Sequence, residues 1–116
     1  MEKFDQDEIN KLARWFKLLG EPKRLLLLES IISGVQCNCE IGKSLGMAPN
    51  LISHHLSVLR EAGIIETERA VGDSRWIYYS VNPQVMQQLQ GIMATFFDRG
   101  RIQPRHMHCG PKANDD

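Results

Sequence analysis

The chain has 116 residues, of which 42% are hydrophobic, and its formal net charge is zero. This length supports one domain of ordinary size rather than two. Because the chain has no excess of basic residues, its charge alone gives no argument for nucleic-acid binding. No apolar run reaches the roughly 20 residues that span a bilayer, and the acidic N-terminus does not resemble a signal peptide. We therefore expect no membrane partner and a cytoplasmic location.

Two segments at the beginning of the chain have the pattern of α-helices. Residues 5–19 place apolar side chains at i, i+3, i+4 and i+7, and Gly20 follows them. Residues 21–34 begin with Glu-Pro, end with Gly34 and are apolar on most sides. This second pattern is typical of a central core helix.

The next two predicted helices, 37–46 and 49–63, are short and are joined by the turn "MAPN". They form a helix-turn-helix. After Gly63 the apolar period changes from 3.6 to 2, which predicts a β-hairpin with strands at 64–70 and 75–81. A hairpin directly after a recognition helix is the wing of a winged helix-turn-helix.

A last helix is predicted over residues 84–98, and no periodic pattern follows from Gly100 onward. The fold class is therefore mainly α with a β-hairpin. We predict a winged helix-turn-helix domain over 1–99 and a flexible C-terminal tail over 100–116. The first and last helices carry more apolar surface than a small core needs, so we expect a homodimer through them.

Polar residues cover the outer face of the predicted recognition helix. A dimer of such helices usually reads two half-sites, so the expected partner is double-stranded operator DNA with an imperfect inverted repeat. The side chains expected to contact DNA are Asn50, Ser53, His54, Ser57 and Arg60 on the helix, with Arg69 and Arg75 on the wing. His55 lies beside the apolar stripe, and the sequence leaves open whether it contacts DNA or is buried.

Three segments carry a family resemblance. "LGEPKRLLLLESI" and "ISHHLSVLREAGII" resemble the segment that leads into the reading head and the recognition-helix signature of the ArsR/SmtB family of metal- and arsenic-responsive repressors. "GDSRWIYYSVNP" is similar to the wing of that family and to the start of its last helix. The resemblance covers roughly residues 9–98 and implies a transcriptional repressor rather than an enzyme. In agreement, no nucleophile–base pair is recognisable in the sequence.

The segment "QCNCEIGKSLG" is similar to the "LCVCDLxxxL" box of the arsenic- and cadmium/lead-sensing branch. Cys37 and Cys39 match the two cysteines of this box. Gly42 stands where arsenic sensors commonly have a third cysteine, so a third ligand must come from elsewhere. The predicted last helix has no histidine, which argues against the family's histidine-based zinc site.

Cys109, in the tail, is the third cysteine of the chain. Three thiolates match the trigonal set that As(III) or Sb(III) accepts, and soft thiolates also select Cd(II) and Pb(II). Tetrahedral Cd(II) or Zn(II) requires a fourth ligand, for which His106 and His108 are the candidates. Cys109 can reach the pair within one protomer or across a dimer, and the sequence does not decide between these arrangements.

The one-residue spacing of the cysteine pair restricts its chemistry. In an ideal helix, residues two apart are rotated by about 200°, whereas in an extended segment they face the same side. The pair can therefore share an ion only if the start of the predicted helix is unwound. A helix N-terminus would also lower the pKa of these thiols.

The same thiols fit two kinds of inducer. A Cys37–Cys39 disulfide would close a tight ring, so in a reducing cytosol we expect free thiols or metal ligands. The sequence predicts a repressor that As(III) or Sb(III) releases from DNA. The alternatives are a Cd(II)- or Pb(II)-responsive repressor, and a thiol-redox or persulfide sensor on the same fold.

Overall fold

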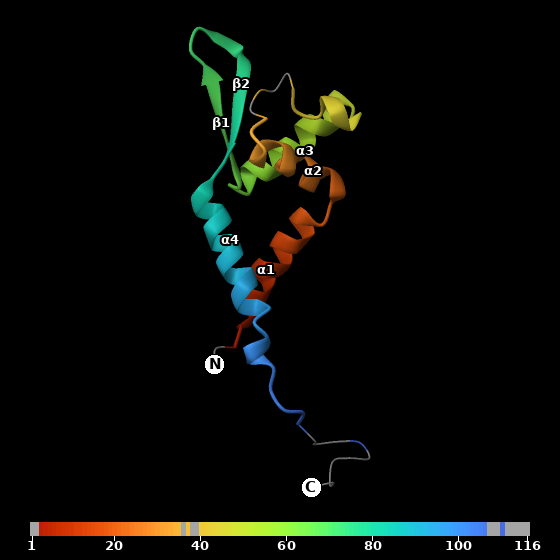
Figure 1. Cartoon of the computed structure of the whole chain (residues 1–116), viewed down its shortest axis with the longest axis vertical. Coiled ribbons are helices and arrows are strands. Elements are labelled where there is room, and N and C mark those ends of the chain that lie inside the picture. Colours follow the sequence, from red (N-terminus) through yellow and green to blue (C-terminus); the bar gives the residue numbers. More distant parts are fainter. Residues whose placement is uncertain (1–2, 36, 38–39, 107–109, 111–116) are drawn as a thin grey trace.

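The computed structural model describes residues 3–35, 37, 40–106 and 110. Within these residues the chain forms α-helices, two short 3-10 helices and one antiparallel β-hairpin (Figure 1). In chain order the elements are α1 (Gln6–Leu19), α2 (Pro22–Ile32), η1 (Lys43–Leu45), α3 (Pro49–Glu61), β1 (Ile65–Ala70), β2 (Asp73–Val81), α4 (Pro83–Phe96) and η2 (Arg99–Arg101). None of the described helices is long and apolar enough to cross a membrane.

Short-range capping fixes where the helices begin. The Glu8 N–H donates to the Asp5 carboxylate at 2.8 Å, and the Asp5 N–H donates to the Glu8 carboxylate at 3.1 Å. This reciprocal pair is a capping box at the start of α1. The Asn82 side chain accepts a hydrogen bond from the Gln84 N–H at 3.0 Å at the start of α4. The first residues of α2, α3 and α4 are prolines, whose fixed φ suits that position.

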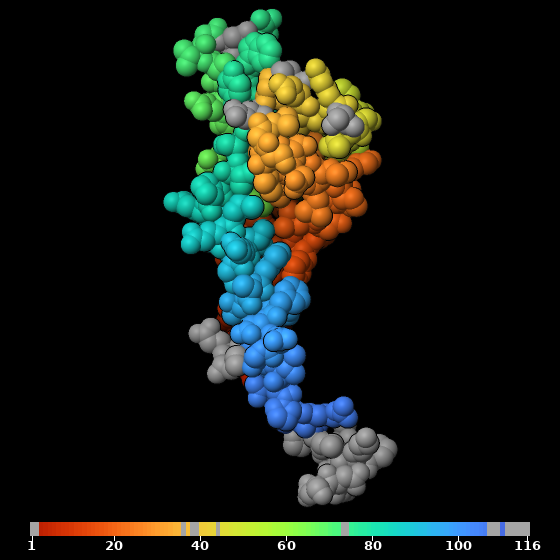
Figure 2. All heavy atoms as spheres, in the orientation of Figure 1, coloured from red at the N-terminus to blue at the C-terminus, as the bar shows by residue number. Residues whose placement is uncertain are grey.

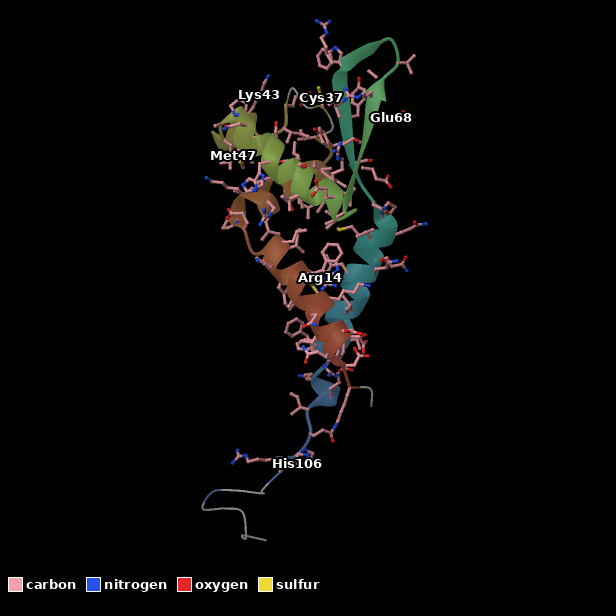
Figure 3. The ribbon with its side chains drawn as sticks, turned by 180° about the vertical axis from the view of Figure 1, so that it is seen from behind. Arg14, Cys37, Lys43, Met47, Glu68 and His106 are labelled. Carbon is pink, nitrogen blue, oxygen red and sulfur yellow. The ribbon has the colours of Figure 1, made fainter. Side chains whose placement is uncertain are left out.

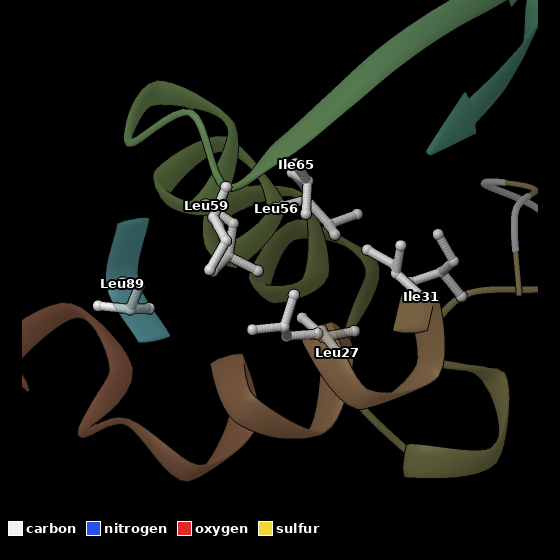
Figure 4. Packing of buried hydrophobic residues seen from close by; sticks show 9 residues of the cluster. Leu27, Ile31, Leu56, Leu59, Ile65 and Leu89 are labelled. Atoms are coloured by element: carbon white, nitrogen blue, oxygen red, sulfur yellow. The ribbon is translucent and has the colours of Figure 1, made fainter. Parts of the chain in front are cut away.

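The core lies where α2 meets α3 and the base of the hairpin (Figure 4). Leu27 from α2, Leu59 from α3 and Ile65 from β1 are essentially inaccessible to solvent. Leu89 of α4 closes this cluster from the other side and is also buried. Full burial of one such side chain contributes about 1.5–3 kcal/mol. The core therefore fixes the orientation of α3 relative to the hairpin.

The first and last helices extend away from this core and come together at their far ends (Figure 1). There the Phe4 and Phe96 rings meet edge to face with their centroids 5.3 Å apart. The Arg101 guanidinium lies 4.8 Å from the centroid of the Phe4 ring. The molecule is consequently elongated, with dimensions of 73 × 27 × 22 Å.

The predicted helix over 37–46 is wrong. Cys37 instead pairs with Tyr78 of β2 in an isolated antiparallel bridge, and only Lys43–Leu45 form a 3-10 turn. Gly42 and Gly46 on either side of this turn have φ of 83° and 66°, in the left-handed region. A regular helix cannot pass through such residues. The other predicted helices and the hairpin are confirmed, and η2 crosses the predicted domain boundary at residue 99.

The environment of Gly42 generates a prediction about stability. A Cβ at Gly42 would lie 2.5 Å from Cδ1 of Ile52, whereas a Cβ at Gly46 meets nothing within 4 Å. We expect Gly46→Ala to lower the free energy of unfolding by about 1–2 kcal/mol, the cost of a left-handed conformation. Gly42→Ala should cost about 1–3 kcal/mol more, because the core must also make room for the methyl group. Urea unfolding of both variants measures the difference, and equal losses would contradict the role given to Ile52.

Candidate nucleic-acid interface and thiol site

The outer face of α3 carries the polar side chains that the sequence assigns to DNA. Asn50, Ser53, His54 and Arg60 are exposed, and Ser57 is half-buried. The opposite face of the helix is buried in the core. The structure therefore gathers these five residues on one side of one helix, as a major-groove reader requires.

The hairpin places its arginines on the side that faces α3. Side chains alternate along a strand, so Arg75, Ile77 and Tyr79 share one face of β2. Arg69 of β1 is paired with Ile77, so it lies on that same face of the hairpin. Tyr79 lines a small groove of about 150 Å³ between α3 and the hairpin. Ser53, Ser57 and Arg60 line the other side of this groove.

Two arginines act on the Tyr79 hydroxyl at this junction, although the whole chain is neutral. Burial raises the pKa of the Tyr79 hydroxyl, and the nearby cations of Arg60 and Arg69 act in the opposite direction. One arginine from the recognition helix and one from the wing thus lie close to the same hydroxyl. Such convergence of positive charge suits a phosphate backbone. Tyr79 itself is absent from the residues that the sequence assigns to DNA, and its alternation with Arg75 along β2 is the signal that could have identified it.

His55 is buried. The sequence leaves open whether this residue contacts DNA or is buried in the core. Only 6% of its surface is exposed, and its Nδ1 atom is buried without a hydrogen-bond partner. Burial lowers the pKa of His55, and the Arg24 guanidinium lowers it further. We therefore remove His55 from the residues proposed to contact DNA.

The thiol site is only partly within the described residues. Cys39, His108 and Cys109 lie outside them. Cys37 is half-buried beside β2, and its sulfur is in a disulfide bond whose partner lies outside the described residues. This differs from the free thiol that the sequence predicts. Because no α-helix begins at Cys37, the predicted effect of a helix N-terminus on this thiol does not apply.

The structure separates Cys37 from the histidine of the tail that it describes. Figure 3 shows Cys37 near the hairpin and His106 at the opposite end of the molecule. Among the described residues no group of three or more His, Cys, Asp or Glu side chains is arranged to hold a metal ion. The described residues of one protomer therefore do not form a complete set of metal ligands.

Backbone conformation and packing explain why position 42, where the family box commonly has a third cysteine, is a glycine. Its backbone is left-handed, and it is covered by Ile52 of α3. A cysteine at this position would be strained and would collide with the recognition helix. The third thiolate is consequently excluded from this local position.

The buried imidazole generates a prediction about pH. In the unfolded chain His55 titrates near its ordinary pKa of about 6.5, and its pKa in the fold is lower. As the pH falls through about 6.5, the unfolded state therefore binds more protons than the fold, and the stability due to neutral His55 is lost progressively toward the lower pKa of the folded state. We expect His55→Gln to reduce this loss, while His54→Gln, a change at the exposed neighbour, keeps it. Urea midpoints at pH 5, 6 and 7 measure the effect, and an unchanged pH dependence in His55→Gln would contradict it.

Comparisons with known proteins agree with this geometry. Residues 21–67 match the family described as bacterial regulatory protein, arsR family. The chain is 35% identical over 89 residues to an uncharacterized HTH-type transcriptional regulator of Methanocaldococcus jannaschii, covering 75% of this chain and 91% of the relative. It is 33% identical to an arsenic resistance transcriptional regulator of Pseudomonas putida, covering 72% of this chain and 63% of the relative.

A solved structure shows the same fold. The crystal structure of a possible transcriptional regulator for arsenical resistance superimposes with a TM-score of 0.63 at 29% identity, covering 73% of this chain and 85% of that chain. The matched segment contains α2, α3 and the first half of β1, which belong to the reading head. The family and these relatives are transcriptional regulators and not enzymes. The chain belongs to the arsR family of bacterial regulatory proteins, which bind DNA through a winged helix-turn-helix.

Proposed function

We propose that the protein is a transcriptional repressor that As(III) or Sb(III) releases from operator DNA by binding the thiolates of Cys37, Cys39 and Cys109 in the reduced protein, after a reductant has opened the disulfide at Cys37. The observation that carries this proposal is the pairing of Cys37 with Tyr78, which attaches the cysteine segment to the wing. A change in backbone conformation at Cys37 acts directly on a strand of the DNA-reading head. Its proposed place of action is the cytoplasm.

The switch follows from this pairing. An ion held by Cys37 and Cys39 needs both side chains on one side of the backbone, which fixes the conformation of the segment between them. The segment is bridged to β2, so ligand binding shifts the hairpin relative to α3. Arg60 and Arg69 then no longer match the spacing of the DNA phosphates. By linkage, operator DNA must weaken arsenite binding by the same factor by which arsenite weakens DNA binding.

The proposed assembly is a homodimer through α1 and α4. These helices expose apolar side chains on their outer surfaces, including Phe16 at 40% and Phe97 at 65% exposure. The Phe16 and Phe97 rings are tilted by 51° to each other, with their centroids 6.1 Å apart, and contiguous exposed apolar surface is typical of a protein interface. A two-fold dimer would present two α3 helices to an inverted repeat.

The third thiolate is proposed to come from the partner protomer. Cys109 follows His106 by three residues, so it lies within about 11 Å of the His106 Cα atom. His106 and Cys37 are at opposite ends of a molecule 73 Å long (Figure 3). The tail leaves α4 at this end. It could reach Cys37 of its own protomer only if the residues after α4 folded back along the molecule.

A second candidate function is thiol-redox sensing, because the Cys37 sulfur is in a disulfide bond. Two thiols would lose two protons and two electrons to an oxidant such as a peroxide or persulfide, and the disulfide would change the segment bridged to β2. This function requires no metal. A third, Cd(II) or Pb(II) sensing, uses the same cysteines with His106 or His108 as a further ligand.

Titration of DNA binding tests these functions. Fluorescence anisotropy would use an inverted-repeat duplex selected by the protein from random sequence, in the presence of a reductant. We expect arsenite to lower the DNA affinity of the wild type by about 5- to 150-fold, the usual range of allosteric coupling. Cys37→Ser, Cys39→Ser and Cys109→Ser should each bind DNA normally and not respond.

The outcomes separate the candidates. If Cys109→Ser responds like the wild type, the three-thiolate set is wrong, and if Cys37→Ser responds, thiol sensing of arsenite is wrong. Loss of DNA binding with peroxide and no metal, but not with arsenite, would favour redox sensing. Release by Cd(II) or Pb(II), and not by arsenite, would favour the third candidate.

The arginines at the junction between α3 and the hairpin predict the salt dependence of DNA binding. Arg60 is exposed on α3, and we expect Arg60→Gln to remove one phosphate contact per protomer. The slope of log K against log salt should then become shallower by about 1.8 for a dimer. Arg14→Gln on α1, far from this junction (Figure 3), is the control and should leave the slope unchanged. An unchanged slope in Arg60→Gln would remove Arg60 from the interface.

A further inference from the structure

An open groove lies on the side of the hairpin that faces away from α3. Its volume is about 650 Å³, and it is formed by the end of α2, the base of the hairpin and the start of α4. Figure 2 shows these segments meeting at the surface, the end of α2 in orange and the start of α4 in cyan. Its lining combines an apolar floor, in which Ile32 and Tyr78 are 49% and 41% exposed, with polar side chains such as Glu68 and Gln87. A groove of this size, with apolar side chains and a few polar groups, is typical of a binding site.

A row of residues connects this groove to the thiol site. Glu68 of β1 is paired with Tyr78 of β2, and Tyr78 is paired on its other edge with Cys37. Directly opposed residues of antiparallel strands share one face of the sheet, so all three side chains lie on the groove side. Neighbouring strands are about 4.8 Å apart, which places the Cα atoms of Glu68 and Cys37 about 10 Å from each other. Figure 3 shows both residues at the hairpin end of the molecule.

The charge of the groove is acidic at one end. Among the residues that the structure describes, the Glu68 carboxylate has no hydrogen-bond or ion-pair partner. The segment that leaves the far end of the molecule has the complementary chemistry. Ile102 in it is 77% exposed, and the exposed Arg105 guanidinium likewise has no partner in the described part of the chain.

We propose that the groove binds residues 102–109 of the partner copy, with Arg105 of that segment against Glu68. This inference rests on the proposed function, because it gives the route by which Cys109 of one protomer reaches Cys37 of the other. Ile102 covers the apolar floor. Cys109 follows Arg105 by four residues, a span of up to about 14 Å when extended. This span covers the roughly 10 Å between Glu68 and Cys37.

The consequence is that the tail is a structural element of the dimer. Docking of the tail brings a third thiolate to the edge of β2 before any ion binds. It also couples the sensing segment of one reading head to the dimerisation helix of the other. The ion is then bound between protomers.

Photo-cross-linking between two isotopically distinct copies tests the docking. Gln103 is replaced by benzoyl-phenylalanine in a Cys109→Ser chain, which is mixed with a 15N-labelled Cys109→Ser chain, without arsenite. We expect cross-linked peptides that join position 103 of one copy to residues 76–90 of the other. Glu68→Lys should lower their yield by about fivefold, as for a partly exposed charge pair.

Two controls make this test specific. Glu66→Lys reverses a charge on the same face of β1 but outside the groove lining, and it should not change the yield. Combining Glu68→Lys with Arg105→Glu should restore the yield. Cross-links confined to one copy, cross-links to other surfaces, or an unchanged yield in Glu68→Lys would each overturn the docking.

The result is independent of the arsenite titration. Cross-links to the groove, with no response of DNA binding to arsenite, would retain the docking and reject the proposed inducer. A response to arsenite without such cross-links would retain the inducer and reject the docking.

Discussion

The packing of α2 against α3 and the base of the hairpin is the constraint on which the rest of the structure depends. Leu27, Leu59 and Ile65 are contributed by three different elements and are all essentially inaccessible to solvent. Protein interiors are close-packed, so these three side chains hold the base of the hairpin against the recognition helix. The part of the hairpin beyond Ile65 lies outside this buried cluster and is the part that the proposed switch moves. The groove that Tyr79 lines together with Arg60 lies between α3 and the hairpin, so it depends on this packing. The DNA-reading surface is thus a consequence of the core.

The bridge between Cys37 and Tyr78 changes how a thiol ligand would act on this surface. The sequence predicts that the cysteine segment starts a helix and that ligand binding unwinds it. In the structure that helix is replaced by an extended residue at the edge of β2, followed by one 3-10 turn between two left-handed glycines. In the proposed switch the wing, and not a helix, is therefore the element to which a change at Cys37 is passed first. Gly42, packed under Ile52, also excludes a third local thiolate.

Because the protomer is elongated, the proposed sensing site depends on the proposed dimer. The helices α1 and α4 carry the two chain ends away from the reading head, and their contact through Phe4, Phe96 and Arg101 stabilises that arrangement. In the proposed function, a ligand set that combines Cys37 with the tail is assembled from two copies. A sensor built in this way would report on the geometry of the whole dimer, because the proposed ion would join the reading head of one copy to the last helix of the other.

Local sequence determined most of the secondary structure. Prolines at the first position of α2, α3 and α4, the Asp5–Glu8 capping box and the change of apolar period after Gly63 act over a few residues, so they can be recognised without a fold. The polar face of α3 follows from the same periodicity. The tertiary structure decided the rest: the backbone of residues 40–46, where two apolar positions fit a helix or a single turn equally well, and the burial of His55 near the start of α2. It also decided the distance between Cys37 and the tail. These features depend on which surfaces the core brings together, and contacts between residues far apart in the chain leave no periodic signal in the sequence.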